Sequence, residues 1–287
     1  MKTFAVIDIG SNSVRLMFVA DGKVLYKRVN TTRLGEGIAA RPILKTEAIE
    51  RSAQAVADFY EQAKEAGAEK IFAFATAAVR SAENGSVFVK RVDELCGLRV
   101  EVVSGEEEAE LGVLGALGGD DGGVIDVGGA STEIVIKSSG KILYRKSIDV
   151  GVVRLKDGCG REEDKLRSAS NVAAIAYGSL PFVDNVYAIG GTATTLAALK
   201  KKLSEYDSKQ ITGTAITIEE MQQFAQTLLG MKIEEIAALP CMPKGRADVL
   251  AGGAVLLFTL MKRFGWKKLI VSDQDNLEGY AIKKGLM

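Results

Sequence analysis

Short runs of apolar residues recur along the chain, and each ends at a polar or glycine-rich turn. The first run covers residues 4–7 and stops at Asp8, and a second run covers residues 14–19. An Asp21-Gly22 turn then leads to a third run at residues 23–29. Two-residue turns of this kind join antiparallel strands. The pattern therefore predicts a three-stranded meander with a polar tip after Asp8.

Stretches with helical spacing of apolar residues alternate with further strands. Thr46 is expected to cap a helix that ends at Gly67, because the apolar positions between them follow a 4-3-4-3 spacing. A strand at residues 71–75, a helix at about 85–96, a strand at 99–103 and a helix at 105–117 complete the first half. Such alternation is typical of a partly parallel sheet covered by helices.

The second half of the chain begins again as the first did. A glycine- and aspartate-rich break at residues 118–123 precedes an apolar strand that ends at Asp126, and residues 126–134 align without gaps over residues 8–16. We therefore expect an α/β protein of two related lobes with mixed sheets, residues 1–118 and 119–287, with the ligand in the cleft between them. A last helix at about residues 279–287 is expected to pack back on the first lobe.

Composition limits the kinds of partner. The 287 residues hold 37 Lys and Arg against 37 Asp and Glu, so no overall basic field attracts nucleic acid or an anionic membrane. The start reaches Asp8 too soon for a signal peptide, and the apolar run at 249–261 is too short to span a bilayer. Three widely spaced cysteines without a C-x-x-C favour a reducing, cytoplasmic location.

The chain contains no histidine. This excludes Ser-His-Asp and Cys-His nucleophiles, H-E-x-x-H zinc sites and histidine-based two-metal phosphatase centres. Any catalysis must depend on carboxylates, a hard metal ion or backbone dipoles.

Three glycine-rich loops have the composition of anion sites. Glycine lets backbone amides approach a phosphate, and hydroxyl side chains add donors. The third loop also precedes a helix that we expect to open at Leu196, where free amides favour an anion. Each loop taken alone also fits an ordinary hairpin turn or helix cap. The loop residues assigned to phosphate binding are Gly10, Ser11, Asn12, Ser13, Gly128, Gly129, Ala130, Ser131, Thr132, Gly190, Gly191 and Thr192.

Charged side chains accompany these loops. Asp8, Asp126 and Glu133 are hard oxygen ligands suited to Mg²⁺, with Mn²⁺ and K⁺ as further candidates, although each acid also fits a turn cap or a solvated strand position. Arg15, Arg80 and Arg246, with Thr76, are suited to neutralising phosphate oxygens, and surface salt bridges are the alternative.

Residues 104–110 place four acids at the start of one helix. Acids stabilise a helix N-terminus, which is a sufficient reason for them. One of them could instead enter the cleft as a general base for water. Helical spacing groups Glu106 with Glu110 but does not identify the catalytic one.

The chain resembles the exopolyphosphatase / guanosine pentaphosphatase (Ppx/GppA) phosphohydrolases of the actin-like ATPase superfamily. Six motifs occur in the family's order: D-I-G-S-N-S-V-R-L from Asp8, T-A-A-V-R from Thr76, S-G-E-E-E-A from Ser104, D-V-G-G-A-S-T-E from Asp126, G-G-T-A-T from Gly190 and R-A-D from Arg246. The resemblance implies two actin-like lobes in a short, two-lobed form. It also implies that Glu108 is the general base, aided by Arg80, and that Asp126 and Glu133 help bind Mg²⁺.

The activity implied by this resemblance is release of terminal orthophosphate from inorganic polyphosphate or pppGpp by water attack. A homodimer is a further expectation. Two departures from the family pattern bear on activity: Ala130 replaces a third glycine of the second loop, and residues 272–279 lack a usual Gly and Arg. They leave open a non-catalytic pppGpp or polyphosphate sensor. An ATP-using member of the same superfamily is a further alternative.

Overall fold

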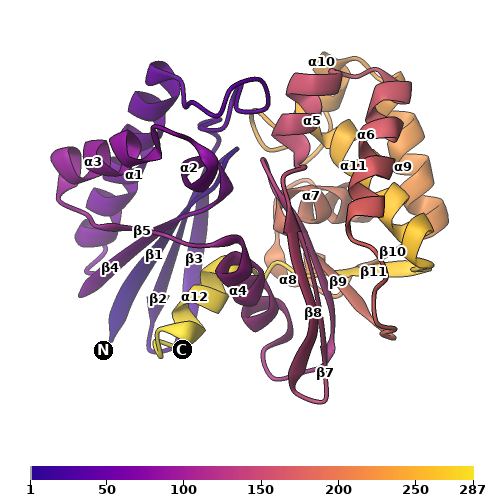
Figure 1. Ribbon diagram of the computed structural model, residues 1–287. Coiled ribbons are helices and arrows are strands. Elements are labelled where there is room, and N and C mark those ends of the chain that lie inside the picture. Colours follow the sequence, from indigo (N-terminus) through magenta and orange to yellow (C-terminus); the bar gives the residue numbers. More distant parts are fainter. Residues whose placement is uncertain (1) are drawn as a thin grey trace.

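Two mixed β-sheets organise the chain in the computed structural model, which describes residues 2–287 (Figure 1). The first sheet has the strand order β3-β2-β1-β4-β5. Its strands are β1 (Thr3–Ile9), β2 (Val14–Ala20), β3 (Lys23–Asn30), β4 (Lys70–Ala75) and β5 (Val100–Val102). β1 pairs antiparallel with β2 and parallel with β4, so the sheet is mixed as expected.

Side chains of β1 alternate between the two faces of the first sheet, because successive strand residues point to opposite sides. Ala5 and Ile7 join one apolar cluster, which also contains residues of α1 (Thr46–Glu65) and α3 (Gly85–Cys96). Phe4 and Val6 join another, with residues of α4 (Gly105–Leu117) and α12 (Asn276–Lys283). Both faces of the sheet are therefore covered by helices.

The second sheet has the strand order β10-β11-β9-β6-β7-β8. Its strands are β6 (Gly122–Val127), β7 (Thr132–Ser138), β8 (Lys141–Ile148), β9 (Val186–Ile189), β10 (Ala215–Thr217) and β11 (Lys268–Val271). The remaining helices are α2 (Ala77–Ser81) near the first sheet and, after β8, α5 (Val152–Cys159), α6 (Glu163–Ala176), α7 (Gly190–Lys201), α8 (Ser208–Ile211), α9 (Ile218–Gly230), α10 (Ile233–Ala237) and α11 (Ala247–Phe264).

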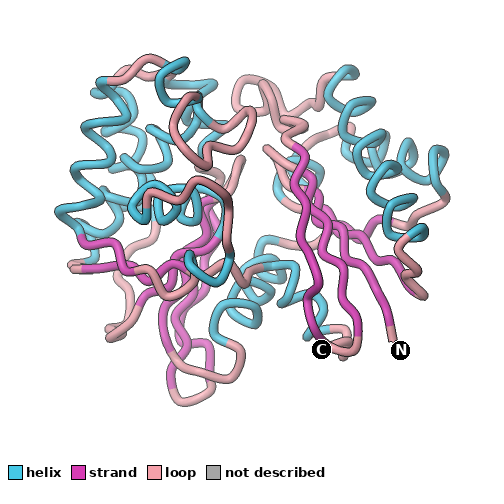
Figure 2. The backbone as a smooth tube through the Cα atoms, turned by 180° about the vertical axis from the view of Figure 1, so that it is seen from behind, coloured by secondary structure: helices cyan, strands magenta, loops and turns pink. Residues whose placement is uncertain are grey.

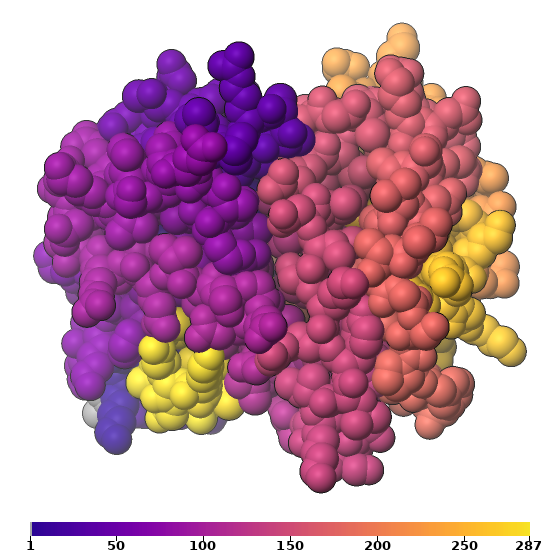
Figure 3. Space-filling model, viewed as in Figure 1, coloured from indigo at the N-terminus to yellow at the C-terminus, as the bar shows by residue number. Residues whose placement is uncertain are grey.

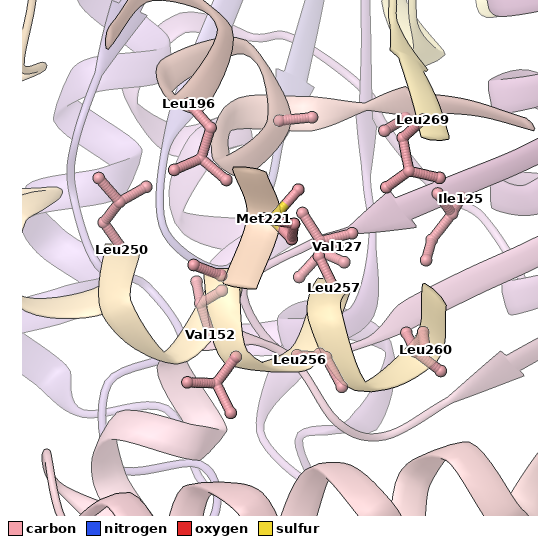
Figure 4. Packing of buried hydrophobic residues seen from close by; sticks show 14 of the residues in the cluster. Ile125, Val127, Val152, Leu196, Met221, Leu250, Leu256, Leu257, Leu260 and Leu269 are labelled. Carbon is pink, nitrogen blue, oxygen red and sulfur yellow. The ribbon is translucent and has the colours of Figure 1, made fainter. Parts of the chain in front are cut away.

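The core of the second lobe forms around α11. Leu250, Leu256 and Leu260 of this helix are buried in one cluster with Ile125 of β6 and Leu196 of α7 (Figure 4). α11 packs against α5, α6 and α9. A helix that is apolar on most of its surface is expected in such a central position.

The two meanders repeat one another in detail. β1 pairs with β2 so that Asp8 faces Arg15, and β6 pairs with β7 so that Asp126 faces Glu133. Each meander also shifts register once, between Phe18 and Val19 in the first and at the aligned position in the second. The repeat seen in the sequence is thus a repeat of strand register as well as of residue type.

The chain crosses between the lobes twice, at α4 and at the connection from β11 to α12. α4 and α12 lie against each other, and α12 also packs on β1 whereas α4 packs on β6, β7 and β8, so the C-terminal helix lies with the first lobe (Figures 1 and 3). Glycine permits this approach, because a Cβ on Gly115 would lie 1.9 Å from the Asp275 carbonyl oxygen and one on Gly279 would lie 1.8 Å from that of Leu111. The division of the chain at residue 118 stays a prediction.

Several element boundaries differ from those expected. Lys45, not Thr46, is the N-cap of α1, and no side chain caps that helix. β6 begins at Gly122, inside the glycine-rich break. α7 begins at Gly190 instead of Leu196, and α12 spans residues 276–283 instead of 279–287, because in both places the polar turn is itself the first turn of the helix. In the described part of the chain, no helix is long and apolar enough to cross a membrane.

Candidate active site

A cavity of about 560 Å³ lies between the lobes, where the three glycine loops meet. Its walls include most of the residues that the sequence assigned to a site: Asp8, Gly10, Ser11, Asn12, Ser13, Arg15, Thr76, Glu108, Asp126, Gly128, Gly129, Ser131, Gly190, Gly191, Thr192 and Arg246. Residues more than two hundred positions apart are therefore neighbours. The tube view from behind shows the two sheets side by side, each in its own half of the molecule (Figure 2).

The first two loops have the same internal hydrogen bond. The Gly10 amide donates to the Ser13 carbonyl over 3.0 Å, and the Gly128 amide donates to the Ser131 carbonyl over 3.0 Å. The loops also touch, since a Cβ on Gly129 would lie 2.8 Å from the Cβ of Ser11. Glycine is required there to let the two loops face each other closely.

Neighbouring backbone holds each loop from outside the cavity. The amides of Arg33 and Gly35 donate to the carbonyls of Asn12 and Ser11, at 2.9 and 2.8 Å. On the other lobe, the first amides of α5 donate to the carbonyls of Gly128 and Gly129, at 2.9 and 2.7 Å. Carbonyls that are occupied in this way leave loop amides and hydroxyls as the groups available to an anion.

The third loop is the first turn of α7, and Arg246 lies directly against it. A Cβ on Gly191 would overlap the Arg246 guanidinium, at 1.2 Å from Nη1. Arg246 has no ion pair among residues 2–287, and its buried Nε has no hydrogen-bond partner there. Burial, and then the nearby charge of Arg15, lower the pKa of Arg246 to about 10. A partly buried cation without a counter-ion among the described residues, beside a helix start, is an anion site by its electrostatics.

The structure distinguishes the four acids of α4. Glu106 and Glu110 both bind Arg145 of β8, as expected for residues on one helix face. The carboxylate of Glu107 accepts the Ser104 amide in a capping box. Glu108 alone is buried and lines the cavity. Of the four, it is the one placed to act on a substrate.

Arg80 holds Glu108 in position from α2. Its Nη1 donates to Glu108 Oε2 over 2.8 Å and to the Val103 carbonyl over 3.0 Å. Burial raises the pKa of Glu108, and the charge of Arg80 opposes this shift. Arg80 does not itself line the cavity. Its contact with the site is therefore through Glu108.

Buried carboxylates gather on the second-lobe side of the cavity. Burial raises the pKa of Asp126 to about 7, although Arg15 opposes the shift. Burial and then the charges of Glu108 and Asp126 raise the pKa of Glu133 well above its usual range. Ser147 donates to Glu133 Oε1 over 2.6 Å. This side of the site carries acids in excess of the bases that could balance them.

These acids fit a divalent cation shared with a substrate. Asp8 Oδ1 and Glu133 Oε2 are buried and accept no hydrogen bond from the described residues, and such oxygens are costly unless a donor or cation meets them. Across residues 2–287, no group of three or more acidic or cysteine side chains is close enough to hold a metal by itself. Mg²⁺ commonly uses one or two carboxylates with water and substrate phosphate, which is compatible with both observations.

A C-terminal segment completes the site, and sequence reasoning missed it. Arg15 binds Asp8 through Nη2 and Asp275 through Nη1, so it already bridges two carboxylates. Asn276 donates to Asp126 Oδ2 over 3.3 Å. The signal that could have identified this segment is its context, because residues 272–276 follow a strand and open a helix just as the third loop does. Further wall residues outside the expected set include Lys27, Tyr206, Met242, Pro243 and Asp273.

Four expected site residues do not reach the cavity wall: Arg80, Ala130, Thr132 and Glu133. The methyl group of Ala130 is fully buried in the apolar cluster of the first lobe, so it points away from the space between the loops. Thr132 uses its hydroxyl to bind the Val150 carbonyl over 2.5 Å. Glu133 lies behind the wall, beside Ser147 and close enough to Glu108 for their charges to interact.

Comparison with known proteins agrees with this geometry. The model of the Ppx/GppA phosphatase family matches residues 16–285. Exopolyphosphatase 2 of Mycobacterium tuberculosis is 32% identical, with 97% of each chain covered. A guanosine-5'-triphosphate,3'-diphosphate pyrophosphatase of Vibrio vulnificus is 29% identical over 99% of this chain and 58% of its own. A crystal structure of the Aquifex aeolicus Ppx/GppA family member superimposes with a TM-score of 0.79 and 29% identity, covering 99% of this chain and 98% of that one.

Proposed function

Because the chain belongs to the Ppx/GppA phosphatase family, we propose that it hydrolyses the terminal phosphoanhydride bond of inorganic polyphosphate, releasing orthophosphate. The observation that carries the proposal is the partly buried guanidinium of Arg246, which faces the cavity beside the third glycine loop and has no carboxylate partner in the described chain. A polyanion supplies the missing negative charge. Phosphoryl transfer depends mainly on such positioning and charge neutralisation.

Glu108 acts as the general base. A water molecule loses a proton to the Glu108 carboxylate while its oxygen forms a bond to the terminal phosphorus, and the bridging phosphoanhydride bond breaks. The products are orthophosphate and a chain shortened by one phosphate. Arg80 keeps the carboxylate at the cavity wall through its 2.8 Å bond, and burial raises the pKa of Glu108 toward the range of an effective base.

Asp126 and Glu133, with Asp8 across the cleft, are the residues that would hold a divalent cation, which we take to be Mg²⁺. When bound, the cation supplies charge neutralisation at the phosphate oxygens. The protein's own part is to orient the acids: Asn276 donates to Asp126, and Ser147 donates to Glu133. These bonds leave other oxygens of the two acids free to meet the cation or its waters.

Arg246→Gln tests the proposal. Charge-assisted hydrogen bonds contribute about 1.5–3 kcal/mol, so KM for polyphosphate should rise roughly 10- to 100-fold. Arg167→Gln is a matched control, since Arg167 is a partly exposed arginine of the same lobe that pairs with Glu163 on α6. Phosphate release would be measured for both variants over a range of substrate concentrations. An Arg246 variant with the wild-type KM would contradict the assignment.

A second candidate substrate is pppGpp. The cavity wall also contains Tyr206, Met242, Pro243 and Val249. An apolar and aromatic wall suits a nucleobase and gives polyphosphate nothing to bind. Met242→Ala should therefore raise KM for pppGpp and leave KM for tripolyphosphate unchanged. Equal effects on the two substrates would remove the reason for this candidate.

A further inference from the structure

The lobes are joined covalently on one side of the cavity only. Both chain crossings, from α4 into β6 and from β11 into α12, lie together where the two helices pack. The opposite side has no covalent connection in residues 2–287. There, the loop between β3 and α1 reaches the second lobe near α5, as the indigo loop at the top of Figure 1 shows.

Polar contacts join the two lobes on this side, where no chain connection does. Arg33 of the first lobe binds Asp248 Oδ2 of α11 over 2.8 Å, and Lys156 of α5 binds the same oxygen over 2.7 Å. The Gly37 amide donates to Asp157 Oδ2 over 2.7 Å. Asp248 thus joins cations from both lobes at one atom.

Arg33 links this contact to the substrate loops. Its amide holds the Asn12 carbonyl of the first glycine loop, and its Nη2 donates to the Gly245 carbonyl over 3.3 Å, next to Arg246. Arg33 also has a positive φ of 54°, which is uncommon for a residue with a side chain and persists only where surrounding contacts require it. One residue therefore contacts the first loop, the segment that carries Arg246, and Asp248.

We propose that Asp248 is a positioning residue: with Arg33 it forms a latch that keeps the non-covalent side of the cleft closed and sets the spacing of the first glycine loop and Arg246. The inference rests on the proposed function for its kinetic part. Asp248 does not line the cavity, so it acts on the substrate only through the residues it holds.

The latch changes the population of the closed state rather than the chemistry. When a binding-competent state is only partly populated, apparent affinity falls by that fraction, whereas a saturating substrate that bridges both lobes restores closure. Loss of the latch should therefore raise KM about 3- to 10-fold and change kcat by less than about 2-fold. A purely structural role in starting α11 would instead lower thermal stability without this split.

The test compares Arg33→Gln, Asp248→Asn and the double variant. Lys45→Gln is the control, because Lys45 pairs over 2.6 Å with Glu36 inside the same segment but within one lobe. Hydrogen exchange of residues 31–38 is measured without substrate, and KM and kcat are measured with polyphosphate. Each single variant should exchange roughly 3- to 10-fold faster than the wild type, and the double variant no faster than a single one, because all three lose the same contact.

The outcomes separate the two proposals. Wild-type exchange in Asp248→Asn, or additive effects in the double variant, would overturn the latch even if hydrolysis is intact. Should Asp248→Asn fold poorly, Asp157→Asn removes the neighbouring Gly37 contact from the same side and must also speed exchange there. Because exchange is measured without substrate, a protein that fails to hydrolyse polyphosphate still tests the latch.

Discussion

The first hairpin of each sheet can be compared residue by residue. β1–β2 and β6–β7 have the same register and loops closed by the same amide-to-carbonyl bond. The cross-strand partner of the loop aspartate differs, however: it is Arg15 in the first lobe and Glu133 in the second. Asp8 is consequently paired with a cation, whereas Asp126 lies among acids and has a pKa raised, mainly by burial, to about 7.

This difference shows how one backbone can serve two chemical purposes. The first loop carries its own positive charge and, with Asp275, ties the C-terminal segment to the site. The acids beside the second loop have no cation paired with them and are balanced only in part by Arg15, which favours a divalent cation. The same loop shape thus occurs twice, and the different residues at one strand position, Arg15 and Glu133, make the two halves complementary.

The largest effect should come from Glu108→Gln, which removes the acid that faces the second-lobe cluster. Loss of a general base typically costs about 10²- to 10⁴-fold in rate. The amide oxygen can still accept the Arg80 bond, so folding should be retained. Phosphate release and thermal unfolding measure these two results. Glu106→Gln, an exposed acid of the same helix turn, should keep wild-type activity, and comparable turnover in the two variants would refute the role of Glu108.

Substitution of the two equivalent residues, Arg15 and Glu133, should have different effects on the free energy of unfolding. Arg15→Gln leaves Asp8 and Asp275 buried without their shared cation, which should destabilise the protein by about 3 kcal/mol. Glu133→Gln removes an uncompensated buried acid and should leave stability unchanged or raise it. Urea unfolding without divalent cation checks the signs. If both variants lose stability equally, the electrostatic comparison of the hairpins is wrong.

Stability should depend on pH through Asp126. The folded state keeps this proton up to about pH 7, whereas the unfolded chain releases it near the ordinary value of 3.8. The folded state thus binds more protons between these values. The contribution is present at acid pH and is lost as pH rises to about 7, at up to about 1.4 kcal/mol per pH unit. Unfolding of the metal-free protein across this range should show a decline that Asp126→Asn reduces.

The smallest effect concerns Ala130, which aligns with Asn12 of the first loop. Asn12 lines the cavity, but the Ala130 methyl group packs into the core of the opposite lobe. Ala130→Gly should therefore destabilise the protein by about 1 kcal/mol and should not raise activity, since no methyl group is removed from the phosphate space. Thermal unfolding and phosphate release measure this. A clear gain in turnover would show instead that the methyl group of Ala130 limits phosphate release.

Much of this protein follows from the sequence alone. The two meanders, the alternation of strands and helices and the three glycine loops depend on local periodicity and turn residues, which a single chain displays openly. The absence of histidine by itself restricts the possible chemistry. The resemblance to a family singled out Glu108 as the expected general base, which helix spacing alone did not distinguish from its neighbours. The expected homodimer, cytoplasmic location and absence of a nucleic-acid partner stay predictions.

Tertiary structure decided what depends on contacts between distant segments. The direction of Ala130 was not visible in the sequence, because it is set by packing of one lobe on the other. The pairing of Arg15 with Asp275 joins residues 260 positions apart, and Arg33 reaches Asp248 from the other lobe. Local propensity determines which elements form. The choice of which side chains share a cleft is made only when two lobes fold against each other, since burial and charge compensation act through space and not along the chain.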